Sequence, residues 1–178
     1  MTKTEKIRLA EVFSYAAHCA CGQTRKYTGE AYFTHPERVA KMVAETPGAN
    51  EDMVCAAYLH DVVEDTQVLQ KDINHLFGPD VAVLVNQLTN VSKPEDGNRE
   101  TRKALDRAHS AKACAEAKTI KLADVLDNLT SITQYDKGFA KKYVAEKKML
   151  LPLLKEGDPG LWIKVHDLIE AWDKENSE

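Results

Sequence analysis

The stretch AAYLHDVVEDT, residues 56–66, joins an apolar segment to four polar side chains. These are His60, Asp61, Glu64 and Asp65, and two valines separate the two pairs. If the stretch is helical, Glu64 lies four residues after His60 and three after Asp61, so all three line one edge. Burying an imidazole and three carboxylates is costly unless their charge is compensated, and a divalent metal would compensate it. The alternative is a buried helix with a solvated, amphipathic C-terminal end.

The composition indicates a folded protein of one domain, residues 1–178. The chain is 43% hydrophobic and 29% charged, which is typical of globular proteins. Its net charge of −4 lacks the basic surplus of a nucleic-acid-binding domain, so we expect no nucleic acid partner. No apolar run approaches the ~20 residues of a membrane span, and the first residues do not resemble a signal peptide. We therefore expect no membrane partner and a cytoplasmic location.

The cysteines are compatible with a reducing compartment. Cys19 and Cys21 would point to opposite sides of a helix, which is a poor chelating geometry. We interpret these two, Cys55 and Cys114 as reduced packing residues, with a structural zinc site as the alternative.

Helical spacing recurs along the chain, without the alternation typical of strands, and predicts an all-α fold. In the predicted first helix, over 4–21, we interpret His18 as a partly buried packing residue. Thr34 or His35 suits the cap of the second helix, and Pro36 its first position. A third helix is predicted from 50 or 51 into the opening stretch, and Thr66 is expected to cap the fourth. The later predicted helices cover 67–77, 80–89, a segment from 98 onward, 117–129, 139–154 and 159–173, the last two being packing helices.

Two segments carry basic side chains that could hold phosphate. Arg25 and Lys26 are adjacent in a turn-rich stretch, where an exposed basic pair is the simpler interpretation. Residues 90–99 are interpreted as a flexible loop. The next helix places Arg99, Arg102 and Lys103 on one face, which is either a solvated surface or a second phosphate-binding patch.

The predicted helix over 117–129 is apolar on most sides, so we expect it to be central. Asp124 and Asn128, four residues apart, form a polar stripe on it, and Lys121 extends the stripe by one turn. Buried polar groups need partners, which could be a structural network, a metal or a ligand.

Two imidazoles and two carboxylates are the polar groups that these helices would bury, and together they make a mixed nitrogen and oxygen ligand set. Such a set suits one Mn²⁺, with Fe²⁺ or Zn²⁺ also open, while the lack of thiolate disfavours a structural zinc. A metal of this kind makes bound water more acidic, and the resulting hydroxide can attack phosphorus. The predicted ligands are His35, His60, Asp61 and Asp124.

Glu64 and Asp65 follow the His60-Asp61 pair by one turn. They are predicted to orient or deprotonate the attacking water and to manage the proton of the leaving group. The residues alone therefore predict metal-dependent hydrolysis of a phosphoester, with a small polyanion as the substrate.

The longer motifs carry a family resemblance. Residues 25–36, the stretch LHDVVEDT at 59–66, and KLAD at 121–124 followed by Asn128-Leu129 resemble the HD-domain metal phosphohydrolases. Within them the chain is similar to the hydrolase domain of the RelA/SpoT family, particularly its small single-domain, Mesh1-like hydrolases. The resemblance covers about residues 5–150, which we take as the catalytic core, and implies a compact helical bundle with a metal site among its central helices.

The resemblance also implies a substrate and roles for the site residues. It implies that Mn²⁺ is bound by the four predicted ligands, that Arg25 and Lys26 face the substrate, and that Asn128 contacts its sugar or phosphate. The implied reaction removes the 3′-pyrophosphate of ppGpp or pppGpp and leaves GDP or GTP. Lys121 and the basic face at 99–103 complete the expected substrate-binding set.

Two departures from the family pattern keep other substrates open. Ala31 replaces a usual proline, and segment 91–118 diverges. The alternatives are an HD-domain phosphohydrolase of another nucleotide, such as a 5′-nucleotidase or an NADPH phosphatase, and a non-catalytic nucleotide sensor. A homodimer is also left open.

Overall fold

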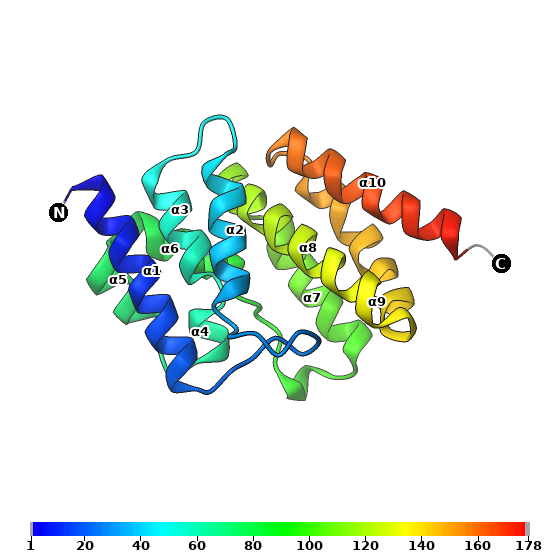
Figure 1. The fold of residues 1–178 in the computed structure, drawn as a ribbon, viewed down its shortest axis with the longest axis horizontal. Coiled ribbons are helices and arrows are strands. Elements are labelled where there is room, and N and C mark those ends of the chain that lie inside the picture. Colours follow the sequence, from blue (N-terminus) through cyan, green and yellow to red (C-terminus); the bar gives the residue numbers. More distant parts are fainter. Residues whose placement is uncertain (1, 177–178) are drawn as a thin grey trace. The chain divides into compact units, whose positions relative to one another are not determined.

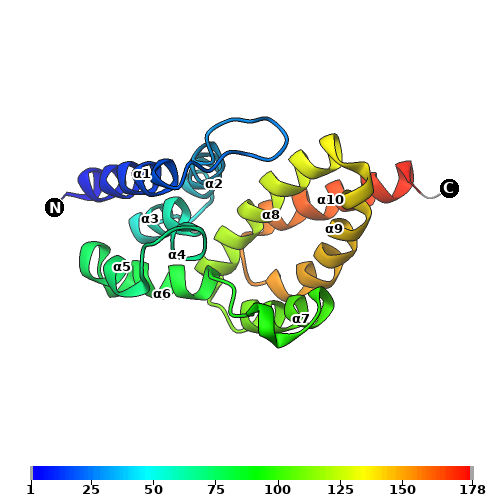
Figure 2. The same ribbon diagram turned by 90° about the horizontal axis from the view of Figure 1, so that it is seen from below.

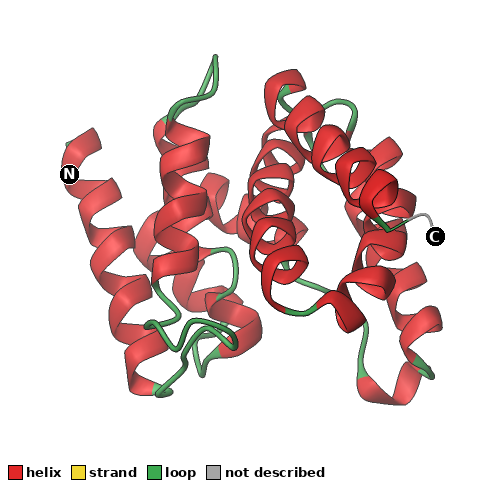
Figure 3. Cartoon of the chain, turned by 45° about the vertical axis from the view of Figure 1, so that its right-hand side comes forward, coloured by secondary structure: helices red, strands yellow, loops and turns green. Residues whose placement is uncertain are grey.

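The computed structural model describes residues 2–176. Within this range the chain consists of helices and loops, apart from an isolated antiparallel bridge between Thr24 and Ala31 (Figure 3). The predicted all-α fold is confirmed. None of the helices in the described part is both long enough and apolar enough to cross a membrane.

The chain forms two compact units, Met1–Asn90 and Val91–Glu178. The helices of the first unit are α1 (Lys3–Ala20), α2 (Thr34–Ala44), α3 (Glu51–Leu59), α4 (Val62–Asp65), α5 (Gln70–Phe77) and α6 (Pro79–Leu88) (Figure 1). Residues 21–33 form the loop between α1 and α2 (Figure 2).

Helix α3 forms the core of the first unit. It packs against α1, α2 and α6, and every residue from 53 to 59 is buried. Its start follows the prediction, because the Asn50 side chain accepts a hydrogen bond of 2.9 Å from the Met53 backbone N–H. The small residues Ala56 and Ala57 are fully buried and allow close packing around the helix.

The sequence predicts that the third helix continues into the opening stretch, and this prediction is wrong. Helix α3 ends at Leu59, His60 and Asp61 form a turn, and α4 begins at Val62. The His60 ring donates from Nδ1 to the Ala57 carbonyl over 2.8 Å, which gives one of the last carbonyls of α3 a partner. Helix α3 therefore ends directly before His60 and Asp61, two of the four predicted metal ligands.

Two predicted helix starts are also wrong. Thr66 does not cap the fourth predicted helix; its hydroxyl donates to the Val62 carbonyl over 2.7 Å and closes α4. Helix α5 begins only at Gln70, where Asp72 accepts from the Leu69 backbone N–H. Helix α2 begins at Thr34 after Phe33, whose side chain cannot cap it.

The second unit is built around the longest helix of the described residues, α8. Its elements are the 3₁₀ turn η1 (Pro94–Asp96), α7 (Arg99–Ala111), α8 (Ala115–Tyr135), α9 (Lys137–Leu150), the 3₁₀ turn η2 (Leu151–Leu154) and α10 (Pro159–Glu175). Helix α8 packs against α9, η2 and α10 and buries Ile120, Leu122 and Leu129 completely. The sequence analysis predicted a central helix over residues 117–129, and α8 is central within this unit. The predicted helix 139–154 narrows to a 3₁₀ turn around Pro152, which lacks a backbone N–H.

A close approach at Gly157 provides a test of this packing. A Cβ there would lie 2.9 Å from both Leu122 Cδ1 and the Thr119 backbone nitrogen. We expect Gly157→Ala to lower the free energy of unfolding by about 1–3 kcal/mol, because overpacking forces neighbours apart. The matched control is Gly138→Ala within α9, where the nearest atom lies at 3.8 Å. This control should raise the free energy of unfolding by about 0.5–1 kcal/mol, because alanine loses less conformational freedom on folding than glycine does. Equal changes in the free energy of unfolding for both variants, measured by urea unfolding, would contradict the close packing at Gly157.

Candidate metal centre

Three predicted ligands converge in the first unit. The ligand atoms of His35, His60 and Asp61 all lie within 4.8 Å of one another. The two Nε2 atoms are 3.2 Å apart, and Asp61 Oδ2 lies 3.1 Å from His60 Nε2 and 3.6 Å from His35 Nε2. The exposed fractions of His35 and His60 are 0% and 1%. The structure thus brings together three of the four predicted ligands.

Local structure holds both histidines in place. His35 is the second residue of α2, and its backbone N–H donates to the Tyr32 carbonyl over 2.9 Å. His60 directly follows α3, which packs against α2. Because the Ala57 carbonyl can only accept, His60 carries its proton on Nδ1 when neutral and turns the Nε2 lone pair towards the cluster.

The donor set fits a divalent transition metal. Two lone pairs and a carboxylate oxygen at these separations repel one another unless a proton or a cation lies among them. Ligand bonds of ~2.0–2.2 Å place neighbouring ligand atoms on one ion roughly 3.0–3.5 Å apart. The measured separations are close to this range, so these residues could hold such an ion.

The two predicted acid–base residues have different surroundings. Glu64 is exposed, and its two oxygens accept hydrogen bonds of 3.1 and 2.8 Å from the backbone and side chain of Asn90. Asp65 is half-buried. Burial, and then the nearby charges of Asp61 and Glu64, raise its pKa, while hydrogen bonds from Gln23 and Tyr32 act in the opposite direction. A raised pKa brings a carboxyl group closer to the range useful for proton transfer near neutral pH.

The polar stripe on α8 lies in the second unit. Asp124 is 7% exposed, and its two oxygens meet Lys121 Nζ at 3.0 Å and the Asn128 amide at 2.6 Å. Within α8, Asp124 therefore has two polar partners. Metal ligation by Asp124 and substrate contact by Lys121 or Asn128 stay predictions.

The first predicted basic pair lies in the loop between α1 and α2. The Arg25 guanidinium lies 5.8 Å from the centre of the Tyr32 ring. Lys26 Nζ lies over the Tyr27 ring and donates to its hydroxyl over 3.3 Å. Aromatic contacts of this kind hold cationic side chains without neutralising their charge.

The second basic patch, on α7, has protein partners within its own unit. Arg99 makes a two-pronged ion pair with Glu146, at 2.7 and 2.9 Å. Lys103 Nζ lies 3.5 Å from Asp106. Arg102 Nε is buried and lacks a hydrogen-bond partner among the described residues. Phosphate binding by this patch stays a prediction, and Arg102 is its best-placed member.

Sequence reasoning gave no role to three residues that contact or surround the predicted site. Tyr32 donates a hydrogen bond of 2.7 Å to Asp61 Oδ2, and the Gln23 side chain is a neighbour of Asp65 that lowers its pKa. Burial and, next, the nearby charge of Lys121 lower the pKa of Lys147 to about 8. The signals for Tyr32 in the sequence were its place three residues before His35 and its place within the motif over residues 25–36.

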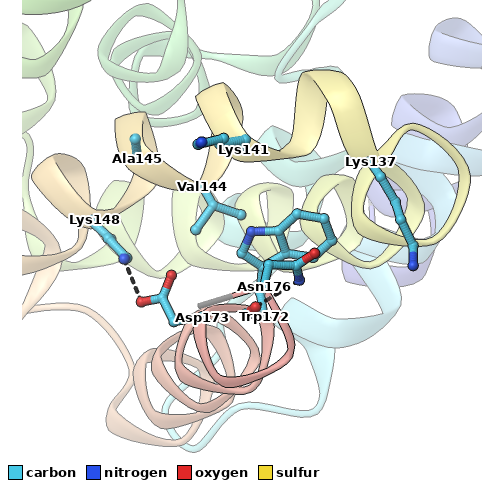
Figure 4. A pocket seen from close by; sticks show the side chains of 8 residues that line it. All are labelled: Lys137, Lys141, Val144, Ala145, Lys148, Trp172, Asp173 and Asn176. Atoms are coloured by element: carbon cyan, nitrogen blue, oxygen red, sulfur yellow. Dashed lines mark hydrogen bonds and ion pairs between the residues drawn. The ribbon is translucent and has the colours of Figure 1, made fainter. Parts of the chain in front are cut away.

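A separate cavity lies between α9 and the C-terminal part of α10 (Figure 4). Its volume is about 380 Å³, and Lys137, Lys141 and Lys148 line it together with Trp172. Lys148 forms an ion pair with Asp173 beside it. None of the predicted site residues lines this cavity, so it does not belong to the candidate metal centre.

Known proteins share both the sequence pattern and the fold. The pattern of the HD domain matches residues 12–151. The guanosine-3′,5′-bis(diphosphate) 3′-pyrophosphohydrolase MESH1 of Drosophila melanogaster is 33% identical over 168 residues, which cover 90% of this chain and 92% of that protein. A probable enzyme of the same name from Synechocystis sp. is 32% identical over 84% of this chain, which spans only 20% of that longer protein.

The structural comparison extends over almost the whole chain. The solved structure of a metazoan orthologue of SpoT that hydrolyses ppGpp has a TM-score of 0.82 and 29% sequence identity. The match covers 93% of this chain and 94% of that one. A structure from Listeria monocytogenes EGD-e has a TM-score of 0.66 with 29% identity and covers 82% of this chain.

The cluster predicts a loss of metal binding when one ligand is removed. We expect Asp61→Ala to abolish binding of Mn²⁺ or Co²⁺ in calorimetric titration, because two imidazoles alone hold a hard cation poorly. The matched control, Asp167→Ala, removes an exposed carboxylate on α10 and should bind metal like the wild type. An Asp61→Ala protein that binds metal with unchanged affinity would refute the assignment.

The raised pKa of Asp65 predicts a dependence of stability on pH. Its folded-state pKa exceeds the unfolded value, so the wild type loses stability as pH rises through the folded pKa. Without metal at pH 7, we expect Asp65→Asn to melt at a higher temperature than the wild type. The difference should shrink as pH falls and the wild-type carboxyl group becomes protonated. Differential scanning calorimetry from pH 7 downward checks this. A difference in melting temperature that is independent of pH would contradict the raised pKa of Asp65.

Proposed function

Because the chain belongs to the HD-domain family, we propose that it is a metal-dependent hydrolase of ppGpp and pppGpp. It removes the 3′-pyrophosphate and leaves GDP or GTP. The observation that carries this proposal is the convergence of His35, His60 and Asp61 in a chain that matches a curated ppGpp hydrolase over nearly its full length. Structural likeness to a solved ppGpp hydrolase supports the same substrate.

In this proposal His35, His60 and Asp61 hold one Mn²⁺, with Asp124 as the fourth protein ligand. The donor set supports an ion of this class, and Fe²⁺ and Zn²⁺ are the other candidates. When bound, such an ion supplies positive charge next to the phosphoryl oxygens and lowers the pKa of water.

The two carboxylates have separate tasks in the reaction. Asp65, with its raised pKa, accepts the proton of the attacking water, whose oxygen forms a bond to the phosphorus next to the ribose. The bond between that phosphorus and the 3′ oxygen breaks, and the 3′ oxygen gains a proton while pyrophosphate leaves. Glu64, held by both nitrogens of Asn90, orients the water or the leaving group.

Several polar and basic side chains are proposed as substrate contacts. Arg25 and Lys26 contact its phosphates from the loop between α1 and α2. In the second unit, Lys121 and Asn128 contact phosphate or sugar, and the α7 patch of Arg99, Arg102 and Lys103 adds positive charge. The contribution of Arg99 requires it to exchange Glu146 for the ligand, so Arg102 is the stronger candidate.

Lys147 supports an anion site in the second unit. Its ammonium group lies near those of Lys121 and Lys103, and the two nearby carboxylates, of Asp124 and Glu146, already pair with Lys121 and Arg99. Polyphosphate would supply the missing negative charge. A cytoplasmic location and assembly as a homodimer complete the proposal.

The choice of substrate is tested by the released product. We expect pyrophosphate from ppGpp and pppGpp in the presence of Mn²⁺, and no orthophosphate from a panel of mononucleotides or NADPH. Orthophosphate from mononucleotides or NADPH alone would replace the proposal by one of the other nucleotide phosphohydrolases. Tight binding of ppGpp without turnover would indicate a nucleotide sensor.

The roles of the carboxylates are tested in the same assay. We expect Glu64→Gln and Asp65→Asn to lower kcat by ~10²–10⁴-fold, the usual contribution of general acid–base catalysis, with metal binding retained. The control is Glu170→Gln, which changes an exposed carboxylate on α10 and should leave kcat unchanged. Variants with wild-type kcat would exclude these residues from proton transfer.

A further inference from the structure

Tyr32 contacts two of the three clustered ligands. Its hydroxyl donates to Asp61 Oδ2 over 2.7 Å, and its ring meets the His35 ring edge-on with centroids 5.9 Å apart. Oδ2 is also the Asp61 oxygen that lies closest to the nitrogens of His60 and His35. The hydroxyl therefore holds the oxygen that faces the candidate metal position.

The same hydroxyl also reaches the predicted proton acceptor. Tyr32 and the Gln23 side chain are also neighbours of Asp65, and their polar groups lower the pKa of its carboxyl group. One phenol thus links a metal-facing carboxylate to a carboxylate proposed to act on water. The Arg25 guanidinium lies 5.8 Å from the centre of the Tyr32 ring, so a proposed substrate-binding side chain lies against it as well.

A buried histidine supports this arrangement from behind. His18 is 1% exposed, and its ring lies 4.8 Å from that of Tyr32. Its Nδ1 lies 2.7 Å from Gln23 Oε1, and since that oxygen can only accept, the histidine donates. With its oxygen engaged, Gln23 has its NH₂ group left to offer to Asp65, whose pKa it lowers. The Tyr32 backbone N–H also donates to the Gln23 carbonyl, over 3.1 Å.

The chemistry of His18 shows that it does more than fill space. Its Nε2 is buried without a hydrogen-bond partner in the described part of the chain. An unpaired buried nitrogen is unfavourable, and an apolar side chain would fill the same volume without it. What histidine adds at this position is the Nδ1–H group that fixes Gln23.

We propose that Tyr32, supported by His18 and Gln23, is a positioning residue for the metal and for Asp65. It holds Asp61 Oδ2 towards the two histidines before the metal binds, and with Gln23 it orients the Asp65 carboxylate. Side chains that orient a metal ligand in this way typically contribute ~10–100-fold to metal affinity. The part concerning the metal rests on the observed cluster, and the part concerning Asp65 rests on the proposed function.

The metal part is tested with Tyr32→Phe, which removes one oxygen and keeps the ring against His18 and His35. Calorimetric titration with Co²⁺ and Mn²⁺, without nucleotide, should show affinity reduced by ~10–100-fold. The Co²⁺ absorption spectrum should also change if Asp61 is less firmly held. The matched control is Tyr15→Phe on α1, whose side chain is 51% exposed, and it should bind metal like the wild type.

The outcomes separate a positioning role from a purely structural one. Wild-type affinity and spectrum in Tyr32→Phe would overturn the metal part even if the melting temperature fell. His18→Leu provides a second variant that keeps the Tyr32 hydroxyl. Because His18 acts through Gln23, this variant should lower kcat for ppGpp while metal affinity stays at the wild-type value. A His18→Leu protein with wild-type affinity and wild-type kcat would overturn the supporting role of His18.

The part concerning Asp65 is tested with Gln23→Met. This variant should lower kcat for ppGpp while metal affinity stays at the wild-type value, whereas Tyr32→Phe should lower both. An unchanged kcat in Gln23→Met would overturn this part. If the wild type binds metal but does not hydrolyse ppGpp, the proposed function fails, while the metal titrations still decide the role of Tyr32.

Discussion

Two imidazole nitrogens and a carboxylate oxygen meet within 3.1 to 3.6 Å of one another in the buried part of the first unit. These atoms repel one another unless a proton or a cation lies among them, and the rest of this unit is arranged to bring them together. Helix α3 is buried over residues 53–59 and ends just before His60. His35, on the neighbouring helix α2, lies next to His60. The end of α3 also turns Asp61 to the same point. The position of the candidate metal site is thus a consequence of where one core helix ends.

The neighbouring polar groups show how the fold manages charge around this point. Asp61 and Asp65 are close enough to affect each other, and burial increases the effect. Hydrogen bonds from Tyr32 and Gln23 partly compensate it, and Asn90 engages both oxygens of Glu64. In the second unit, by contrast, the carboxylates nearest to Lys147, of Asp124 and Glu146, already pair with Lys121 and Arg99. A substrate with several phosphate groups is the natural complement of such an arrangement.

The helical architecture and the ligand types could be predicted from the sequence because both depend on local patterns. Apolar spacing indicated α3 and α8, and Asn50 marked the start of α3 correctly. Local patterns were insufficient where a tertiary contact decided. The end of α3 depends on a hydrogen bond from the His60 ring, and Thr66 closes α4 rather than opening the next helix. Arg99 looked free on a helix face, but it pairs with Glu146, which lies 47 residues further along the chain.

The sequence by itself determined that the chain is helical, it predicted a mixed nitrogen and oxygen ligand set, and its longer motifs carried the resemblance to the HD-domain phosphohydrolases. These conclusions depend on residue types and spacing, which a sequence displays directly. The tertiary structure decided which atoms meet and what holds them. Tyr32 and Asp61 are 29 residues apart in the chain, so their hydrogen bond has no signature in local periodicity. His18 had the appearance of a packing residue, and only its contact with Gln23 revealed its polar role.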